Sequence, residues 1–142
     1  MHPDFVILGR LVVAALLAAV LGWEREQAGK SAGLRTHMLV GIAAALYTAL
    51  GEVASTELGA GRSDPVRAIQ AVAMGIGFLG GGMIFVNRST DRVQGLTTAA
   101  SIWATAAMGI SAGLGHFRLA VGVTVLLAIV LHVLARFDHS ER

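Results

Sequence analysis

The chain has no cysteine and few charged residues, and both shortages narrow its class. Without cysteine, disulfide bonds and thiolate chemistry are excluded. Charged residues make up only 14% of the 142 residues, whereas hydrophobic residues make up 55%. The mean hydropathy of +0.70 is too high for an ordinary soluble domain of this length. The composition therefore indicates a membrane protein.

Long apolar runs take up nearly the whole chain. A transmembrane helix needs about 20 apolar residues to cross a hydrocarbon core roughly 30 Å thick. The runs that approach this length are residues 5–23, 37–53, 66–86, 97–113 and 119–135. We therefore predict an all-α, polytopic fold with about five transmembrane helices, in a single domain over residues 1–142. No basic segment precedes the first run, so we predict a retained helix rather than a signal peptide.

Basic residues between the runs indicate the direction in which the helices cross the membrane. The first and third connections and the tail carry more arginine and lysine than the second and fourth connections. Basic loops remain in the cytoplasm, so the N-terminus is predicted to lie outside and the C-terminus inside. The pI near 9.9 comes from a few loop arginines, and no nucleic-acid partner is expected.

Polar residues gather at the predicted cytoplasmic ends of the runs. The segment 22–37 carries acids, bases and a histidine between two apolar runs, so it must lie at a membrane surface. The predicted members of this inner polar cluster are Glu24, Arg25, Glu26, Arg35, Thr36, His37, Asn87, Thr97, Thr98 and Ser101. For Glu24, Arg25 and Lys30 the alternative is a solvated loop with compensating charges. Glu26 can also pair with Lys30 on a helical extension of the first run.

A second polar group is predicted near the outer ends of the helices. Arg10 lies inside the first run, Glu52 at the end of the second and Gln70 inside the third. An arginine within a span usually pairs or faces a cavity, so we predict an outer cluster of these three residues. Alternatively, Arg10 extends its side chain to the outer headgroups.

Small residues at four-residue spacing indicate where helices approach closely. In lipid, helices associate through close backbone packing and hydrogen bonds. The predicted packing positions are Gly77, Gly81, Thr105, Gly109 and Gly113. We expect the first four helices to form a tight core and the bulkier fifth helix to face lipid or a second copy, with Gly109 on a face that meets partners. The glycines at 80–82 either pack closely or break the third helix beside a polar cavity.

Two short motifs match enzyme signatures but lie in the wrong context. Residues 75–80 match the dinucleotide fingerprint GxGxxG, which needs a preceding strand and here lies within an apolar helix. Residues 109–113 match the nucleophile elbow GxSxG, but the histidine nearest to Ser111 in sequence, His116, lies in a loop. We predict no catalytic residue and no enzymatic activity.

Three blocks of sequence resemble the signature blocks of the MgtC/SapB family of bacterial membrane proteins. They lie at residues 23–37, 75–80 and 95–106, and the resemblance runs from about residue 7 to residue 134. The chain resembles the short SapB/YhiD-like branch, because the C-terminal soluble domain of MgtC has no counterpart here. The resemblance implies a multi-pass protein of the bacterial cytoplasmic (inner) membrane. It also implies a link to Mg²⁺ homeostasis and to low-Mg²⁺ and acid stress, in a family associated with virulence.

Two functions stay open at this point. The resemblance implies modulation of other membrane proteins, and the ladders of small residues suit helix–helix contacts as the means. The expected partners are the lipid bilayer and those proteins, with a homo-oligomer as one arrangement. The alternative is a transporter, or a transporter subunit, for Mg²⁺ or another ion. Proteins usually hold Mg²⁺ through carboxylates and retained waters, yet Glu52 is the one acid within a predicted span. The small residues favour association. No cofactor is predicted, and Mg²⁺ is the one candidate ion.

Overall fold

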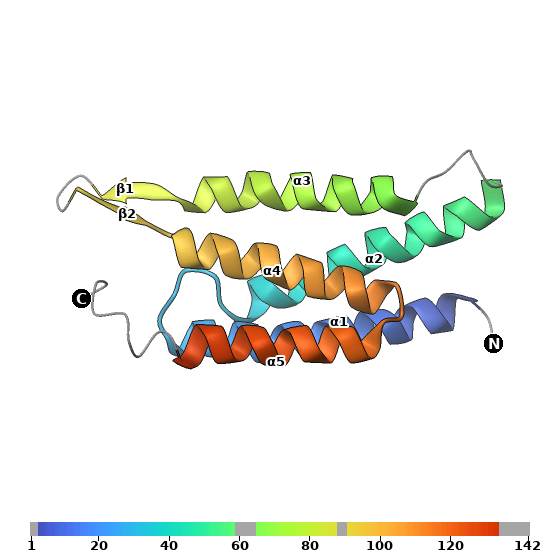
Figure 1. The fold of residues 1–142 in the computed structure, drawn as a ribbon, viewed down its shortest axis with the longest axis horizontal. Coiled ribbons are helices and arrows are strands. Elements are labelled where there is room, and N and C mark those ends of the chain that lie inside the picture. The colour runs from blue at the N-terminus through green and yellow to red at the C-terminus, as the bar shows by residue number, and fades with distance from the viewer. Residues whose placement is uncertain (1–2, 59–64, 88–90, 134–142) are drawn as a thin grey trace.

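The computed structural model describes residues 3–58, 65–87 and 91–133, and most of these residues are helical. The helices are α1 (Pro3–Gln27), α2 (Leu34–Leu58), α3 (Pro65–Met83), α4 (Leu96–Gly113) and α5 (Phe117–Val133). They lie along one long axis and alternate in direction, so α1 begins and α5 ends at opposite ends of the bundle (Figure 1). The predicted helical class is confirmed.

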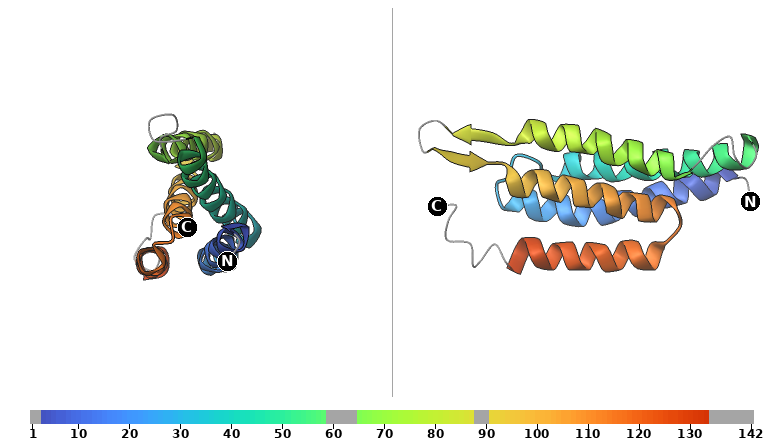
Figure 2. Two further views of the ribbon diagram at one scale, coloured as in Figure 1. Left: turned by 90° about the vertical axis from the view of Figure 1, so that its right-hand side faces the viewer. Right: turned by 45° about the horizontal axis from the view of Figure 1, so that its top comes forward.

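Three of these helices are long and apolar enough to cross a membrane, namely α1, α2 and α3. The helix α5 is apolar as well but has 17 residues. The helix α4 carries several hydroxyl side chains and contacts each of the other four helices. It lies between α3 and α5 in both views of Figure 2. Its central position buries three of its hydroxyl residues, Thr98, Ser101 and Thr105.

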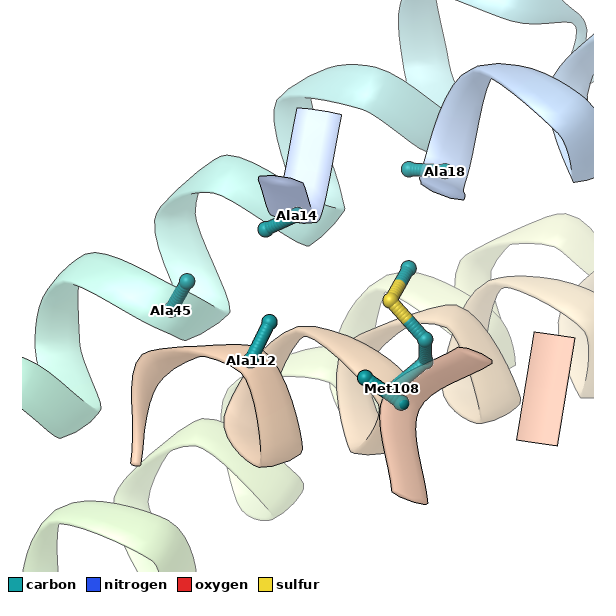
Figure 3. Packing of buried hydrophobic residues seen from close by; sticks show 6 residues of the cluster. Ala14, Ala18, Ala45, Met108 and Ala112 are labelled. Carbon is teal, nitrogen blue, oxygen red and sulfur yellow. The ribbon is translucent and has the colours of Figure 1, made fainter. Parts of the chain in front are cut away.

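The closest packing joins α1, α2 and α4. The buried side chains at its centre are Ala14, Ala18, Ala45, Met108 and Ala112, with Ala120 from α5 (Figure 3). A Cβ added to Gly109 would lie 2.6 Å from the carbonyl oxygen of Gly41, and one added to Gly113 would lie 2.5 Å from that of Ala45. Gly109 therefore faces α2 inside the bundle, and the expectation that it meets partners was wrong.

The helix α3 packs against α2 and α4 through Val72, in a second buried cluster with Val40, Ala44, Ile102 and Ala106. The first four helices therefore share two buried clusters rather than the one tight core that was expected, and the first cluster also includes Ala120 of α5. Gly77 and Gly81 are exposed, and a Cβ at either position meets no atom within 4 Å. Gly80 is buried, with its Cβ position 3.6 Å from the Cβ of Ala99 in α4. The helix α3 continues through the glycines at 80–82 to Met83, so these glycines do not break it.

A short antiparallel hairpin follows α3, although a helix had been expected through residue 86. Its strands are β1 (Phe85–Asn87) and β2 (Arg92–Gln94). Gly95 turns the chain from β2 into α4 with a φ of 86°, a backbone conformation that favours glycine. A Cβ at this position would overlap the carbonyl of Met83. The hairpin thus joins the end of α3 to the start of α4, at the end of the bundle where α1 ends and α2 begins (Figure 1).

Candidate functional site

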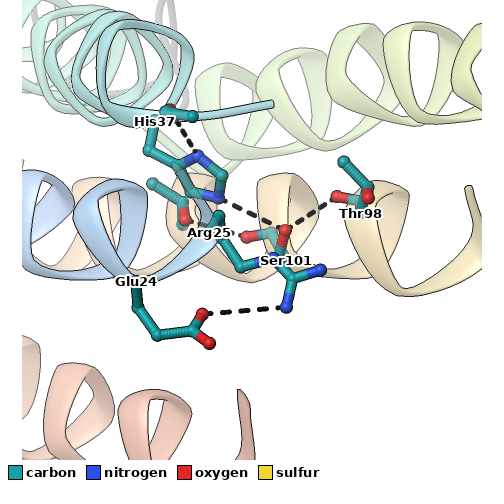
Figure 4. A network of polar contacts seen from close by, with 7 residues as sticks. Glu24, Arg25, His37, Thr98 and Ser101 are labelled. Atoms are coloured by element: carbon teal, nitrogen blue, oxygen red, sulfur yellow. Dashed lines mark hydrogen bonds and ion pairs between the residues drawn. The ribbon is translucent and has the colours of Figure 1, made fainter. Parts of the chain in front are cut away.

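Three helix ends bring five of the predicted polar residues together. Glu24 and Arg25 come from the end of α1, His37 from the first turn of α2, and Thr98 and Ser101 from the beginning of α4 (Figure 4). Arg25 and His37 are almost completely buried, with relative exposures of 2% and 0%. Thr98 and Ser101 are buried as well, and Glu24 is partly buried. We call these five residues the Arg25 site.

The other members of the predicted inner cluster lie outside the Arg25 site. Those that are exposed or partly buried elsewhere are Arg35, Thr36, Asn87 and Thr97. Glu26 is exposed, and its Oε2 accepts a hydrogen bond from the backbone N–H of Leu34 at 2.8 Å. Its carboxylate therefore caps the start of α2, where negative charge is favourable. The helix α1 extends beyond the predicted run as far as Gln27 and ends before Lys30.

His37 connects α2 to α4 through both ring nitrogens. Its Nδ1 lies 3.0 Å from the carbonyl oxygen of Gly33, and because a carbonyl only accepts, Nδ1 carries a proton. Its Nε2 lies 3.2 Å from Oγ of Ser101, and that hydroxyl also lies 2.8 Å from the carbonyl of Thr98. When the His37 ring is neutral, the single hydroxyl proton of Ser101 can be donated either to the carbonyl oxygen of Thr98 or to Nε2 of His37, but not to both. A protonated ring would donate to Ser101 and satisfy all three contacts at once.

Arg25 carries the least satisfied polar atoms of the site. Its Nη1 lies 3.7 Å from Oε2 of Glu24, which is an ion pair but too long for a hydrogen bond. Nε and Nη2 of Arg25, and Oε2 of Glu24, are buried without a hydrogen-bond partner in the described part of the chain. A buried charge without full pairing is costly. These three atoms therefore mark a place where a further polar group would stabilise the protein.

Two glycines allow the backbones to approach around this site. A Cβ at Gly22 would lie 2.7 Å from Cα of Leu34 and 3.0 Å from Cβ of His37. A Cβ at Gly33 would lie 2.7 Å from Oε2 of Glu26. The role of Gly33 as an acceptor for His37 was not predicted from the sequence. The four-residue separation of these two residues in the first turn of a helix was the available signal.

The predicted outer cluster forms only in part. Nη1 of Arg10 lies 2.6 Å from Oε2 of Glu52 and also donates to the carbonyl oxygen of Gly113 at 2.8 Å. The guanidinium lies against Gly115, where a Cβ would lie 3.4 Å from Nη2 of Arg10. Arg10 thus joins α1 to α2 and to the negative end of α4. Gln70 is exposed on α3, apart from this pair.

Polar atoms between these two ends are paired with backbone. Thr48, Thr105 and Thr124 are buried, and each hydroxyl donates to the carbonyl four residues earlier at 2.7 to 2.8 Å. Among the residues that the structure describes, no three histidine, cysteine, aspartate or glutamate side chains gather as metal ligands. The interior hydroxyls are therefore committed to their own helices.

Long apolar helices, a core of small residues and charged groups at both bundle ends define a multi-pass helical membrane protein. Residues 11–140 match the MgtC family, and the chain belongs to this family, as the sequence blocks had predicted. No solved structure matches the chain.

Several curated proteins are similar to the chain over most of its length. "Putative magnesium transporter YhiD" of Escherichia coli (strain K12) is 39% identical over 94% of this chain and 61% of its own length. "Protein SrpB" of Synechococcus elongatus is 39% identical over 86% of this chain and 71% of its own length. "Protein MgtC" of Salmonella typhimurium (strain 14028s / SGSC 2262) is 37% identical over 87% of this chain and 50% of its own length. The chain thus spans only half to three fifths of YhiD and MgtC.

Proposed function

We propose that this protein serves Mg²⁺ homeostasis in the bacterial inner membrane by binding other membrane proteins through helix–helix contacts. The support comes from one side of α3. Met74, Gly77, Phe78 and Gly81 are separated by three or four residues and so share one face of the helix, which we call the α3 face. Met74 and Phe78 are 77% and 85% exposed. The two glycines leave an open notch between these large side chains.

The glycines of the α3 face are unfavourable unless something approaches them. Each costs a helix up to about 1 kcal/mol relative to alanine. No atom of the described chain lies within 4 Å of a Cβ built at Gly77 or Gly81, so packing inside the protein does not offset this cost. A transmembrane helix of a partner gains most from small residues at four-residue spacing, because its backbone can come close. The proposed occupant of the α3 face is such a helix.

Transport of Mg²⁺ or another ion by the chain itself is the alternative, and the name of YhiD makes it worth testing. Three observations favour binding over conduction. The guanidinium of Arg25 places a cation at the inner end of the bundle. The ion pair of Arg10 and Glu52 joins the helices at the other end. The buried threonine hydroxyls between them donate to backbone carbonyls rather than toward a shared path.

The proposal includes a topology in which all five helices cross the membrane, with the N-terminus outside and the C-terminus inside. The alternating helix directions and the basic residues near the Arg25 site support it (Figure 1). The cysteine-free chain allows a direct test with single cysteines and a membrane-impermeant maleimide. His116→Cys, between α4 and α5, is expected to react in intact cells, and Ser31→Cys only after permeabilisation. The reverse pattern would overturn the orientation.

The binding proposal is tested at the α3 face with a matched control. A photo-reactive residue at Phe78 should crosslink to a membrane protein, and Gly77→Leu should remove both this crosslink and growth at low Mg²⁺. Gly122→Leu is the control, because Gly122 is an exposed glycine of α5 with no atom near its Cβ position. Normal crosslinking and growth in Gly77→Leu would contradict the proposal. Saturable Mg²⁺ entry into proteoliposomes holding only this protein would favour transport.

A further inference from the structure

An apolar groove lies between α1 and α5. Its volume is about 430 Å³ and its exposed walls are apolar. Residues that line it include Leu17, Val20, Val121, Val125, Ala128 and His132. The two helices are in contact near the start of α5, where Ala120 lies in one buried cluster with Ala14 and Ala18 of α1. The groove is therefore a laterally open, apolar space between these two helices.

The groove leads along α1 to the Arg25 site. Leu17, Val20 and Glu24 have the spacing of residues on one face of a helix, so Glu24 continues the row that lines the groove. Figure 4 shows the carboxylate of Glu24 on the side of α1 where α5 lies. His132 in the last turn of α5 lines the same end of the groove. The apolar groove thus adjoins the carboxylate of Glu24, and Arg25 lies beyond it as the ion-pair partner of Glu24.

The unpaired atoms at this end have complementary chemistry. Nε and Nη2 of Arg25 form one edge of the guanidinium, which presents two donors in the geometry that binds two oxygens of one phosphate. Oε2 of Glu24 accepts no hydrogen bond in the described part of the chain, and a carboxylate oxygen suits an ammonium group. The long arginine side chain can turn this edge toward the groove while α1 stays in place.

We infer that the groove and the Arg25 site together bind a phospholipid with an ethanolamine headgroup. An acyl chain lies in the groove, the phosphate accepts hydrogen bonds from Arg25, and the ammonium pairs with Glu24. The charges of the site favour phosphatidylethanolamine over the anionic lipid phosphatidylglycerol, because the glycerol headgroup carries no cation that could pair with Glu24. A partner helix, about 10–12 Å across with its side chains, is too wide for the space between two helices already in contact.

The test measures lipid retention by the whole protein in detergent micelles. Native mass spectrometry counts bound lipid while phosphatidylethanolamine, or phosphatidylglycerol with the same acyl chains, is added. We expect phosphatidylethanolamine to be retained preferentially and inorganic phosphate not to displace it. Equal retention of the two lipids would overturn the headgroup assignment. Displacement by inorganic phosphate would identify a site for a soluble anion and overturn the proposal.

Variants separate the two halves of the site. Arg25→Gln should lower retention of phosphatidylethanolamine about tenfold or more, because a charge-assisted contact is lost. Ala128→Phe should do the same by filling the groove without changing a charge. Glu24→Gln should remove the preference between the two lipids. Unchanged retention in Ala128→Phe would overturn the proposal even where Arg25→Gln fails to fold.

Two exposed residues provide matched controls. Arg67→Gln removes an arginine from the surface of α3, and Val130→Phe enlarges an α5 residue outside the groove lining. Both should retain the lipid like the unmodified protein. Circular dichroism and gel filtration report whether each variant is folded. Equal losses in the controls and in the site variants would show non-specific retention and overturn the proposal.

Discussion

Replacing Gly109 by alanine tests whether α2 and α4 are in backbone contact. The added methyl group would lie 2.6 Å from the carbonyl oxygen of Gly41 and 3.1 Å from Cβ of Ala44. The first of these atoms belongs to the backbone of a helix, so no side-chain rotation relieves the overlap. The helix α2 must shift, or the α2–α4 contact must open.

The magnitude follows from two opposing effects. Overpacking a well-packed core costs about 1–3 kcal/mol. Replacing glycine by alanine in a helix contributes up to about 1 kcal/mol in the other direction. We therefore expect Gly109→Ala to destabilise the protein by about 1–2 kcal/mol. Gly77→Ala meets no atom within 4 Å, so only the second effect applies and the change should be neutral or stabilising.

The assay is unfolding in mixed detergent micelles as the fraction of SDS is raised, followed by tryptophan fluorescence and circular dichroism. Trp103 lies in α4, so its fluorescence reports on the helix that is perturbed. The unmodified protein and the two alanine variants are compared under the same conditions. Gly109→Ala with a midpoint at or above that of the unmodified protein would refute the backbone contact. A lower midpoint for Gly77→Ala than for Gly109→Ala would refute it as well.

Three further predictions concern single contacts. Arg10→Ala should lower the free energy of unfolding by about 1–3 kcal/mol in the same titration, because it loses two charge-assisted bonds. Glu52→Gln should lower it by less than about 1 kcal/mol, because it weakens only the exposed ion pair. Equal losses in the two variants would contradict the contact between Arg10 and α4. Glu26→Gln should weaken the cap of α2 by about 0.3–1 kcal/mol, seen as faster amide exchange in its first turn, and unchanged exchange would count against the cap. Gly95→Ala should lower the thermal midpoint more than Gly29→Ala. Both glycines have a positive φ, but of the two only Gly95 lies against another part of the backbone. Similar midpoints for the two variants would contradict the close contact at Gly95.

Helix positions were largely predictable from the chain. The run at 97–113 differs from α4 by one residue at its start, because apolar runs and glycine-rich turns are local features. The end of α3 was not predictable in the same way. Phe85 and Val86 are apolar enough to continue a helix, and only the pairing of residues 85–87 with residues 92–94 makes this segment a strand. That pairing depends on how α3 and α4 are placed against each other.

The sequence predicted the region in which the candidate site lies, but not which of its polar residues are buried together. Arg25 and Arg35 are the same residue type in one polar segment, yet Arg25 is buried and Arg35 is exposed. The rotation of each helix about its axis decides this difference, and that rotation depends on the partner helices. The outer pair shows the same division. Arg10 and Glu52 meet across two helices, whereas Gln70 at a similar depth does not join them.

The sequence by itself determined the membrane class, the approximate helices and the family, because hydropathy and motifs depend on residues close together in the chain. The tertiary structure decided which small residues are contacts. Gly77 and Gly109 have similar sequence surroundings, but one is open and the other touches the backbone of α2. It also decided which charges are buried, and so left Nε and Nη2 of Arg25 without a hydrogen-bond partner in the described part of the chain. Both outcomes depend on distances between backbones that are far apart in sequence, and no local pattern encodes these distances.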